Sequence, residues 1–187
     1  MISPVLANDP GADAGQAPLF MQGANVRMFW TYMQSITPPG GMAKTADFDL
    51  MAIHRLAPDM IICDFDYETY RNRLRFVGTR VVDVLGEETT GRYLDEVNVG
   101  PYRSQQLAAF TMAVASGWPQ WTLLRVQRER DGSLERIARP GITCERLVVP
   151  LAGPSGTVRQ LAAVMAYAEG AGEGTGFEHR ELVPGKY

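Results

Sequence analysis

The chain opens with a segment whose apolar residues recur at helical spacing. The stripe begins near Val26 and continues through Phe29, Tyr32, Met33 and Ile36. This spacing predicts one amphipathic helix, and the run 38–41 (Pro-Pro-Gly-Gly) ends it. A helix in this place packs either on the rest of the domain or against its copy in a dimer, and the pattern leaves both arrangements open.

The next part of the chain alternates in the manner of strands. Every second position is apolar in residues 60–67, and in 71–77 the apolar Leu74 and Phe76 alternate with polar arginines. A turn at Glu68-Thr69 separates the two stretches. This pattern predicts an antiparallel hairpin. A short helical turn is predicted just before it, at 50–56, and Pro58 is expected to end that turn.

Two further helices and three further strands are predicted after the hairpin. One helix covers 79–85 and closes at Gly86, a residue favoured just past a helix end. A second helix starts at Pro101 and ends at Gly117. Its expected apolar face consists of Leu107, Phe110, Thr111 and Val114. The three strands are predicted at 118–130, 142–151 and 160–168, with turns at Asp131-Gly132 and at 153–156.

This order of elements predicts an α+β domain, in which one antiparallel sheet carries helices on one face. We expect a mobile tail at 1–22, where no apolar period is sustained, and a domain at 23–168 that includes the opening helix. The glycine-rich segment 169–187 is expected to be a second loose tail.

Composition removes several classes of function. The chain has 187 residues, 21% of them charged, with a net charge of −3, which does not favour binding to nucleic acid or an anionic membrane. No apolar run approaches the roughly 18 residues of a membrane helix, and the first residues do not resemble a signal peptide. We therefore expect a cytoplasmic protein. The two cysteines match no metal-ligand spacing, so no metal site is predicted.

A family resemblance rests on the segment between residues 75 and 96. The strings Arg75-Phe76-Val77-Gly78-Thr79 and Thr90-Gly91-Arg92, with Gly86 between them and Asp95-Glu96 after them, resemble the pattern of stand-alone bacterial PAS-like proteins. The resemblance covers roughly residues 26–168. It implies a five-stranded sheet in the order 2-1-5-4-3 with helices over its concave face. It also implies signalling, often through dimers, and frequently without a known ligand.

The implied strand order separates the two cysteines. Cys63 would lie on the first strand and Cys144 on the fourth, with the fifth strand between them. Two strand spacings are about 9.5 Å, beyond the roughly 7 Å limit for a disulfide. We expect two free thiols.

Inward-facing aromatic and long apolar residues are the candidates for a ligand pocket. They are Phe65, Phe76, Phe110, Leu123 and Met165, with Tyr93 at the mouth. Apolar cavities of this kind hold small ligands in many domains. The same residues are also what any filled core uses. No cofactor is predicted, and a small ligand is left open.

Catalysis is not predicted. His54 and His179 are the only histidines, and no nucleophile motif accompanies either of them. Haem ligation by His54 has no supporting pattern around it. The alternative to a signalling module is a small α+β enzyme of the isomerase or hydratase type, which needs a carboxylate or tyrosine in a pocket on the curved sheet.

Partners are predicted from the resemblance and from one strand. The resemblance implies a signalling protein partner, and the opening helix offers a homodimer interface. Arg71, Arg73 and Arg75 alternate on one strand, where they form either a stripe for an acidic partner or a charged edge that discourages edge pairing.

Overall fold

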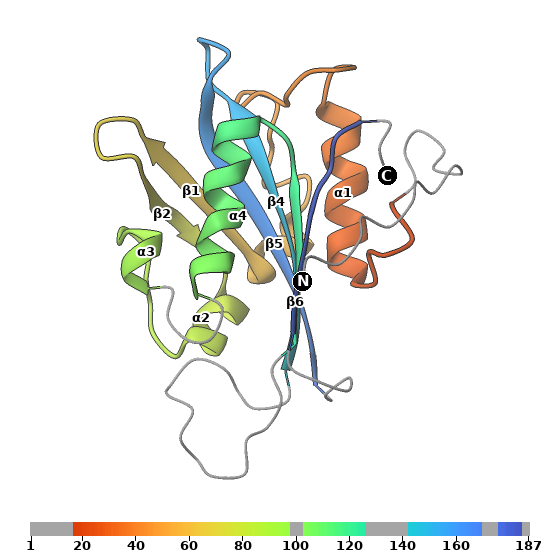
Figure 1. The fold of residues 1–187 in the computed structure, drawn as a ribbon, viewed down its shortest axis with the longest axis vertical. Coiled ribbons are helices and arrows are strands. Elements are labelled where there is room, and N and C mark those ends of the chain that lie inside the picture. Colours follow the sequence, from red (N-terminus) through yellow and green to blue (C-terminus); the bar gives the residue numbers. More distant parts are fainter. Residues whose placement is uncertain (1–16, 98–102, 126–141, 170–175, 185–187) are drawn as a thin grey trace, which may run out of the picture.

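The protein forms one antiparallel sheet with helices on both sides (Figure 1). The computed structural model describes residues 17–97, 103–125, 142–169 and 176–184. Within these residues the sheet has six strands, in the order β2-β1-β5-β4-β3-β6. The strands are β1 (Met60–Asp66), β2 (Arg71–Val77), β3 (Gln120–Arg125), β4 (Ile142–Ala152), β5 (Val158–Glu169) and β6 (Gly176–Glu181). The helices are α1 (Ala24–Ile36), the 3-10 helix η1 (His54–Asp59), α2 (Thr79–Leu85), α3 (Leu94–Val97) and α4 (Arg103–Ser116).

The predicted fold class is confirmed, with one addition. The first five strands follow the expected order 2-1-5-4-3, and a sixth strand pairs with β3 at the end of the sheet. This strand, β6, lies in the segment that was predicted to be a loose tail, so five strands was too few. At the other end of the chain, Met21 is only 2% exposed, which places the end of the predicted mobile tail in the core.

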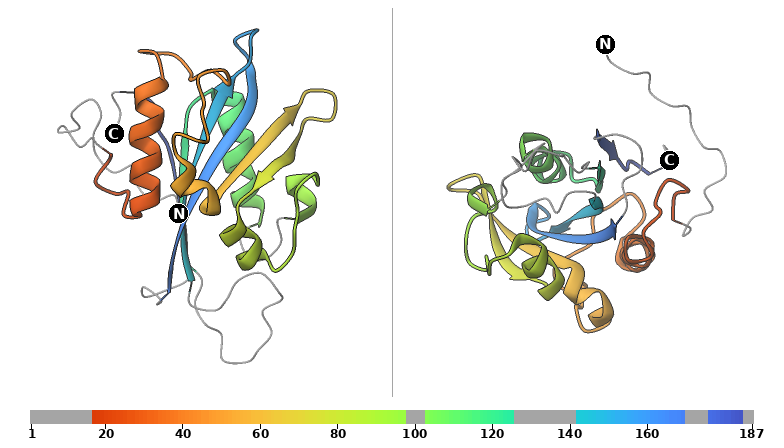
Figure 2. Two further views of the ribbon diagram at one scale, coloured as in Figure 1. Left: turned by 180° about the vertical axis from the view of Figure 1, so that it is seen from behind. Right: turned by 90° about the horizontal axis from the view of Figure 1, so that it is seen from below.

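The helices cover the sheet from two sides. Figure 2 shows α1 and α4 on opposite sides of the central strands. On one side, α1 packs with apolar residues of β3, β4 and β5. On the other side, α2, α3 and α4 pack on β1, β2, β4 and β5. The domain is therefore three-layered at its centre, and each side has its own apolar cluster.

The opening helix lies on the sheet of its own chain. Val26, Phe29, Trp30 and Met33 are all at most 2% exposed, so the predicted stripe is confirmed, with Trp30 added to it. Tyr32 and Ile36 are partly buried against the same cluster. Of the two arrangements that the sequence left open, the structure contains the packing of the helix on the domain.

Three local predictions were wrong or incomplete. The turn before the hairpin is a 3-10 helix with Pro58 inside it, since a helix this short has few internal hydrogen bonds for proline to remove. The buried face of α4 consists of Ala109, Phe110 and Ala113, whereas Thr111 is exposed. Helix α3 was not predicted, because it is shorter than two periods of the helical pattern. The predicted helix start at Pro101 and the turn at 131–132 lie outside the described residues.

Two glycines explain how the motif segment turns. Gly86 adopts a φ of +78° just after α2, the left-handed conformation that glycine tolerates best. Gly78 has an ordinary φ and is needed for space instead. A Cβ atom built on it would lie 2.1 Å from the carbonyl oxygen of Ala57 and 2.3 Å from that of Pro58. The sharp exit from β2 therefore depends on close contact between two backbones.

Candidate functional site

Strand β4 carries two adjacent charged residues, Glu145 and Arg146, whose side chains are buried on opposite faces of the sheet. Glu145 is 4% exposed and Arg146 is 8% exposed. Successive side chains of a strand point to opposite faces. Glu145 therefore enters the α1 side, and Arg146 enters the side covered by α2, α3 and α4. The two charges lie back to back across the sheet and do not form an ion pair with each other.

Arg146 lies between the sheet and the first half of α4. Its Nη2 donates to the carbonyl oxygen of Gln106 at 3.2 Å, and its guanidinium carbon lies 5.0 Å from the centre of the Phe110 ring. Its Nε is buried without a hydrogen-bond partner. In the sheet, Arg146 is flanked by Thr122 on β3 and Met165 on β5. Among the described residues no carboxylate lies within ion-pair distance of this guanidinium.

The ionisable groups that surround Arg146 do not supply a negative charge at neutral pH. Burial raises the pKa of the Cys144 thiol to about 11, and it raises the pKa of the Cys63 thiol and of the Tyr167 phenol further above their ordinary values. Burial also lowers the pKa of Arg146 from its ordinary value. The side of the sheet covered by α2, α3 and α4 thus contains a buried cation, Arg146, whose ionisable neighbours are neutral at this pH.

Glu145 has the opposite situation on the α1 side. Its carboxylate accepts hydrogen bonds from the backbone N–H groups of Gln22 and Gly23, which directly precede α1. It also accepts one from the Trp121 indole nitrogen at 2.7 Å. The positive end of the helix dipole lies at this place, which favours a carboxylate. A Cβ on Gly23 would lie 2.4 Å from the Cβ of Ala166, so only glycine lets the chain approach the sheet this closely. Glu145 therefore joins the start of α1 to β3 and β4.

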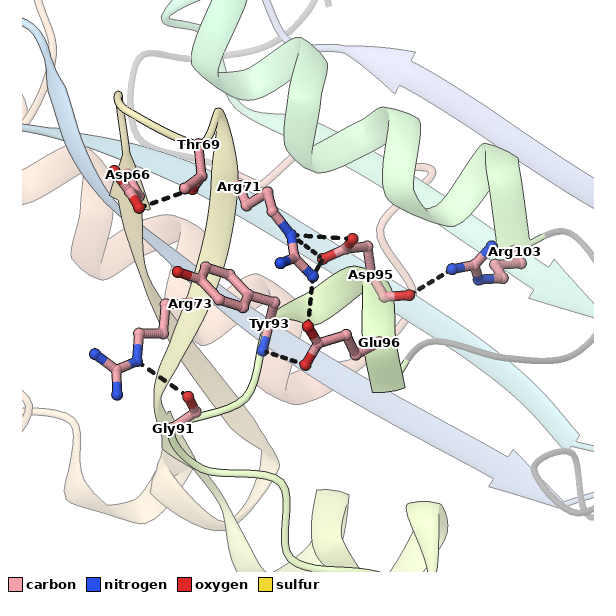
Figure 3. A network of polar contacts seen from close by, with 9 residues as sticks. All are labelled: Asp66, Thr69, Arg71, Arg73, Gly91, Tyr93, Asp95, Glu96 and Arg103. Atoms are coloured by element: carbon pink, nitrogen blue, oxygen red, sulfur yellow. Dashed lines mark hydrogen bonds and ion pairs between the residues drawn. The ribbon is translucent and has the colours of Figure 1, made fainter.

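A second polar cluster holds α3 on the edge of the sheet (Figure 3). Arg71 on β2 donates to both Asp95 and Glu96, and its guanidinium lies 3.8 Å from the centre of the Tyr93 ring. Arg73 donates to the carbonyl oxygen of Gly91 at 3.0 Å. The edge of β2 is itself paired, because Leu74 exchanges backbone hydrogen bonds with residues 91–92.

This cluster includes two of the three arginines of the predicted stripe. Arg71 and Arg73 are bonded within the chain, and Arg75 lies 3.6 Å from Asp64. Arg71 is therefore occupied within the chain, whereas Arg73 and Arg75 are exposed, and a partner-binding role for the stripe stays a prediction. The segment from Thr90 to Glu96 covers the edge of β2 and has a structural role there.

The six predicted pocket residues do not lie together. Phe110 and Met165 belong to the cluster on the side covered by α2, α3 and α4, with Arg146 beside them. Phe76 and Leu123 pack in the opposite cluster, under α1. Phe65 is buried, and its ring packs edge-to-face on Tyr67 at 4.8 Å. Tyr93 lies over Arg71. A ligand-binding role for these six residues stays a prediction; of them, Phe110 and Met165 lie in the same cluster, beside Arg146.

An apolar groove of about 660 Å³ lies elsewhere, beside the second half of α1. Its walls come from Trp30 and Met33, the segment 37–43, the turn 117–119 and the end of β4. None of the six predicted residues lines this groove, and the described residues that line it carry no charge. It has the size of a small-molecule site.

The two histidines lie in different elements, and each contacts a neutral group. His54 is exposed, and its Nδ1 lies 3.0 Å from the carbonyl oxygen of Met51. His179 lies on β6, where its Nε2 is 2.8 Å from the side-chain oxygen of Gln120. Burial lowers the pKa of His179 from its ordinary value. No cluster of metal-ligating side chains occurs in the part of the chain that the structure describes. Within the same residues no helix is long and apolar enough to cross a membrane.

The two cysteines are free, as predicted. Cys63 pairs with Leu161 and Cys144 pairs with Tyr167, so β5 separates them.

Glu145 and Arg146 were missed by reasoning from the sequence. The available signal was a pair of adjacent charges inside the otherwise apolar strand 142–151. Alternation alone places the two residues on opposite faces of the strand. Because both faces are buried, each charge needs a partner that offsets the cost of removing it from water.

Comparison with known proteins finds similarity to solved structures. No family model and no curated protein matches the chain. Among solved structures, it is similar to a light-oxygen-voltage domain studied with a flavin analogue, at 15% identity and a TM-score of 0.46, over 64% of this chain and 84% of that one. It is also similar to a sensory box sensor histidine kinase from Vibrio cholerae, at 12% identity and a TM-score of 0.41, over 64% of this chain and 90% of that one.

The order β2-β1-β5-β4-β3, together with the helices α2 to α4 over one face, is the arrangement that the resemblance to PAS-like proteins implies. The additions to that fold are β6 at one edge and α1 on the outer face.

Proposed function

We propose that this protein is a sensory or signalling module that acts through protein–protein interaction. It responds to a small ligand on the side of the sheet that α2, α3 and α4 cover. The PAS-like fold supports the class of function. Arg146 and Glu145, at the centre of the sheet, are the basis for proposing a ligand and a route by which its binding is transmitted.

One observation carries the proposal: the two buried charges are adjacent residues of one strand. Arg146 meets α4 through Gln106, and Glu145 meets the start of α1 through Gly23. A displacement of β4 on the ligand side therefore acts on the anchor of α1 with no intervening loop. The strand also carries 11 residues through the centre of the sheet, which makes it a stiff connection between the two sides.

The response is a shift between two positions of α1. A ligand changes such an equilibrium only through a difference in its affinity for the two states. When Arg146 moves toward a ligand and carries β4 with it, the carboxylate of Glu145 leaves the line of the N–H groups of Gln22 and Gly23. Hydrogen bonds weaken steeply as their geometry worsens. The bound state therefore favours release of α1.

Release of α1 supplies the protein–protein contact. Its apolar residues, Phe29, Trp30 and Met33, are buried on the sheet of the same chain. A homodimer or a partner complex through this stripe forms only after the helix has left the sheet. Deleting the helix is not a test of this model, because deletion exposes the core beneath it.

The enzyme alternative has no observation in its favour. The two buried carboxylates among the described residues are Glu145 and Asp59. Glu145 is bonded by three donor groups on the outer face, and Asp59 is bonded by Asn25 and Arg80. Neither carboxylate is available as a base in a pocket.

Hydrogen–deuterium exchange of the full chain tests the proposal. We expect the amides of α1 to exchange through a local opening that requires less free energy than the opening of β4 and β5. Light scattering over a range of protein concentrations then measures whether the opened chain self-associates. If α1 exchanges only with global unfolding, at the same opening free energy as β4 and β5, the helix is a fixed part of the core and the signalling model is wrong.

A further inference from the structure

We propose that Arg146 is the recognition point for a small organic carboxylate with an apolar body, bound between β4 and α4. This inference rests on the proposed function and names the class of its ligand.

The first argument is the unspent hydrogen-bonding capacity of the guanidinium. Arg146 is 8% exposed, its Nε has no partner, and its one hydrogen bond in the described residues goes to the neutral carbonyl of Gln106. Buried arginine side chains are normally paired with carboxylates, because a desolvated cation without a counter-charge is costly. A buried polar atom without a partner in a folded protein calls for a specific explanation, such as a ligand or ion.

The second argument is a comparison within the molecule. Three arginines of the sheet and its helices show the usual pairing with a carboxylate: Arg71 with Asp95, Arg80 with Asp59 and Arg125 with Glu178. All three are more exposed than Arg146, with side chains between 32% and 58% exposed. Arg146 is more deeply buried than these three and has no carboxylate among the described residues, whereas Arg73 and Arg159, which also lack one, are exposed and donate to backbone carbonyls. Its neighbour in sequence, Glu145, is directed to the opposite face and is occupied there.

The third argument concerns the kind of anion. The planar guanidinium presents paired N–H groups that match the two oxygens of a carboxylate. Phe110, Met165 and Leu107 provide apolar contacts on the same side. An apolar surrounding penalises a multiply charged phosphate more than a singly charged carboxylate, since the desolvation cost rises steeply with charge. It also favours an apolar body on the ligand.

Titration of the full-length protein with benzoate and hexanoate tests this site. The uncharged controls are benzamide and hexanamide, and the ionic strength is held constant with sodium chloride. Melting temperature and calorimetry give the response. We expect a saturable rise in melting temperature with at least one of the carboxylates and no saturable rise with its amide. A response to phosphate as strong as that to the carboxylates contradicts the ligand class.

Two substitutions at the site separate binding from folding. Arg146→Met replaces the aliphatic part of the side chain with an unbranched apolar one and removes the guanidinium and its charge. We expect it to abolish the carboxylate response, while its melting temperature without ligand equals or exceeds that of the wild type. Arg146→Lys keeps the charge and loses the paired N–H groups, so carboxylate binding weakens by roughly tenfold, the effect of one charge-assisted hydrogen bond. Arg75→Met, at an exposed arginine of β2, is the matched control and leaves the response unchanged.

Several results overturn the proposal. They are equal responses to carboxylate and amide, no saturable response to any probe, or undiminished carboxylate binding by Arg146→Met or Arg146→Lys. A ligand-free melting temperature of Arg146→Met far below that of the wild type also overturns it, because the guanidinium is then paired within the chain. The exchange experiment on α1 is performed without any carboxylate, so its outcome and the outcome of the titration are independent.

Discussion

Replacing Glu145 by glutamine tests the anchor of α1 with the smallest change in shape. In the wild type, one carboxylate oxygen receives the Trp121 indole N–H at 2.7 Å and the Gln22 N–H at 3.1 Å. The other oxygen receives the Gly23 N–H. A glutamine amide keeps one carbonyl oxygen and places an NH₂ group where the second oxygen was. One N–H donor on the sheet or at the start of α1 then faces another donor inside the protein.

The expected loss follows from these contacts. A buried donor without an acceptor costs about 1–3 kcal/mol, and hydrogen bonds to a neutral acceptor are worth about 1 kcal/mol less each than those to a carboxylate. Removing a buried charge returns part of this loss by relieving its desolvation. The free energy of unfolding of Glu145→Gln should therefore fall by about 2–4 kcal/mol.

Urea unfolding followed by tryptophan fluorescence measures this change directly, because Trp121 is one of the donors. The control is Glu178→Gln. This glutamate lies on the same face of the sheet, opposite Leu123 on β3, but it is 43% exposed and paired with Arg125. We expect the control to change stability by less than about 1 kcal/mol. A Glu145→Gln variant within about 0.5 kcal/mol of the wild type would mean that α1 is held by apolar packing alone.

Three further predictions concern the core. Gly78→Ala should destabilise the protein by about 3 kcal/mol or more in thermal unfolding, because its Cβ meets two backbone carbonyls, whereas Gly176→Ala, where a Cβ meets nothing within 4 Å, should be nearly neutral. Burial depresses the pKa of His179 in the fold, so its contribution to stability is present above about 6.5 and is lost as the pH falls. Urea unfolding between pH 7.5 and 5 should show a smaller acid loss for His179→Gln; an identical loss would refute the assignment. Cys63 and Cys144 should resist maleimide at pH 7.5 until the protein unfolds, with Cys144 the faster of the two, and mass spectrometry that finds rapid labelling of Cys63 would contradict its burial.

The parts of the fold that could be predicted are those where one face is apolar and the other polar. The bounds 71–77 for β2 and 79–85 for α2 came directly from such alternation and from Gly86. β6 could not be found in this way. Its residues are all half-buried except the exposed Glu181, and its sequence Gly-Phe-Glu-His-Arg-Glu has only one large apolar residue. It is held by backbone pairing with β3 and by polar contacts such as Arg125–Glu178.

The candidate site could not be predicted for a related reason. Periodicity places a residue on a face of a strand, but it does not say which element covers that face. Phe76 and Leu123 were assigned to one pocket with Phe110, yet a helix covers each side of the sheet and the two groups lie in separate clusters. The assignment assumed helices on only one face. Because α1 covers the second face, a buried residue of the sheet can belong to either of two apolar clusters, one on each side.

The same two-sided burial is what makes the adjacent pair on β4 informative. In a sheet with one solvated face, one of two neighbouring charges would point to water and need no partner. Here both are desolvated. The chain gives the carboxylate of Glu145 three donor groups, whereas among the described residues it gives Arg146 one neutral carbonyl and leaves its Nε without an acceptor. The asymmetry is the basis for treating Glu145 as a structural anchor and for proposing Arg146 as the ligand-binding group on the same strand. A ligand carboxylate at Arg146 would complete on one face the kind of charge neutralisation that the start of α1 already provides on the other, and the strand between them would connect the two.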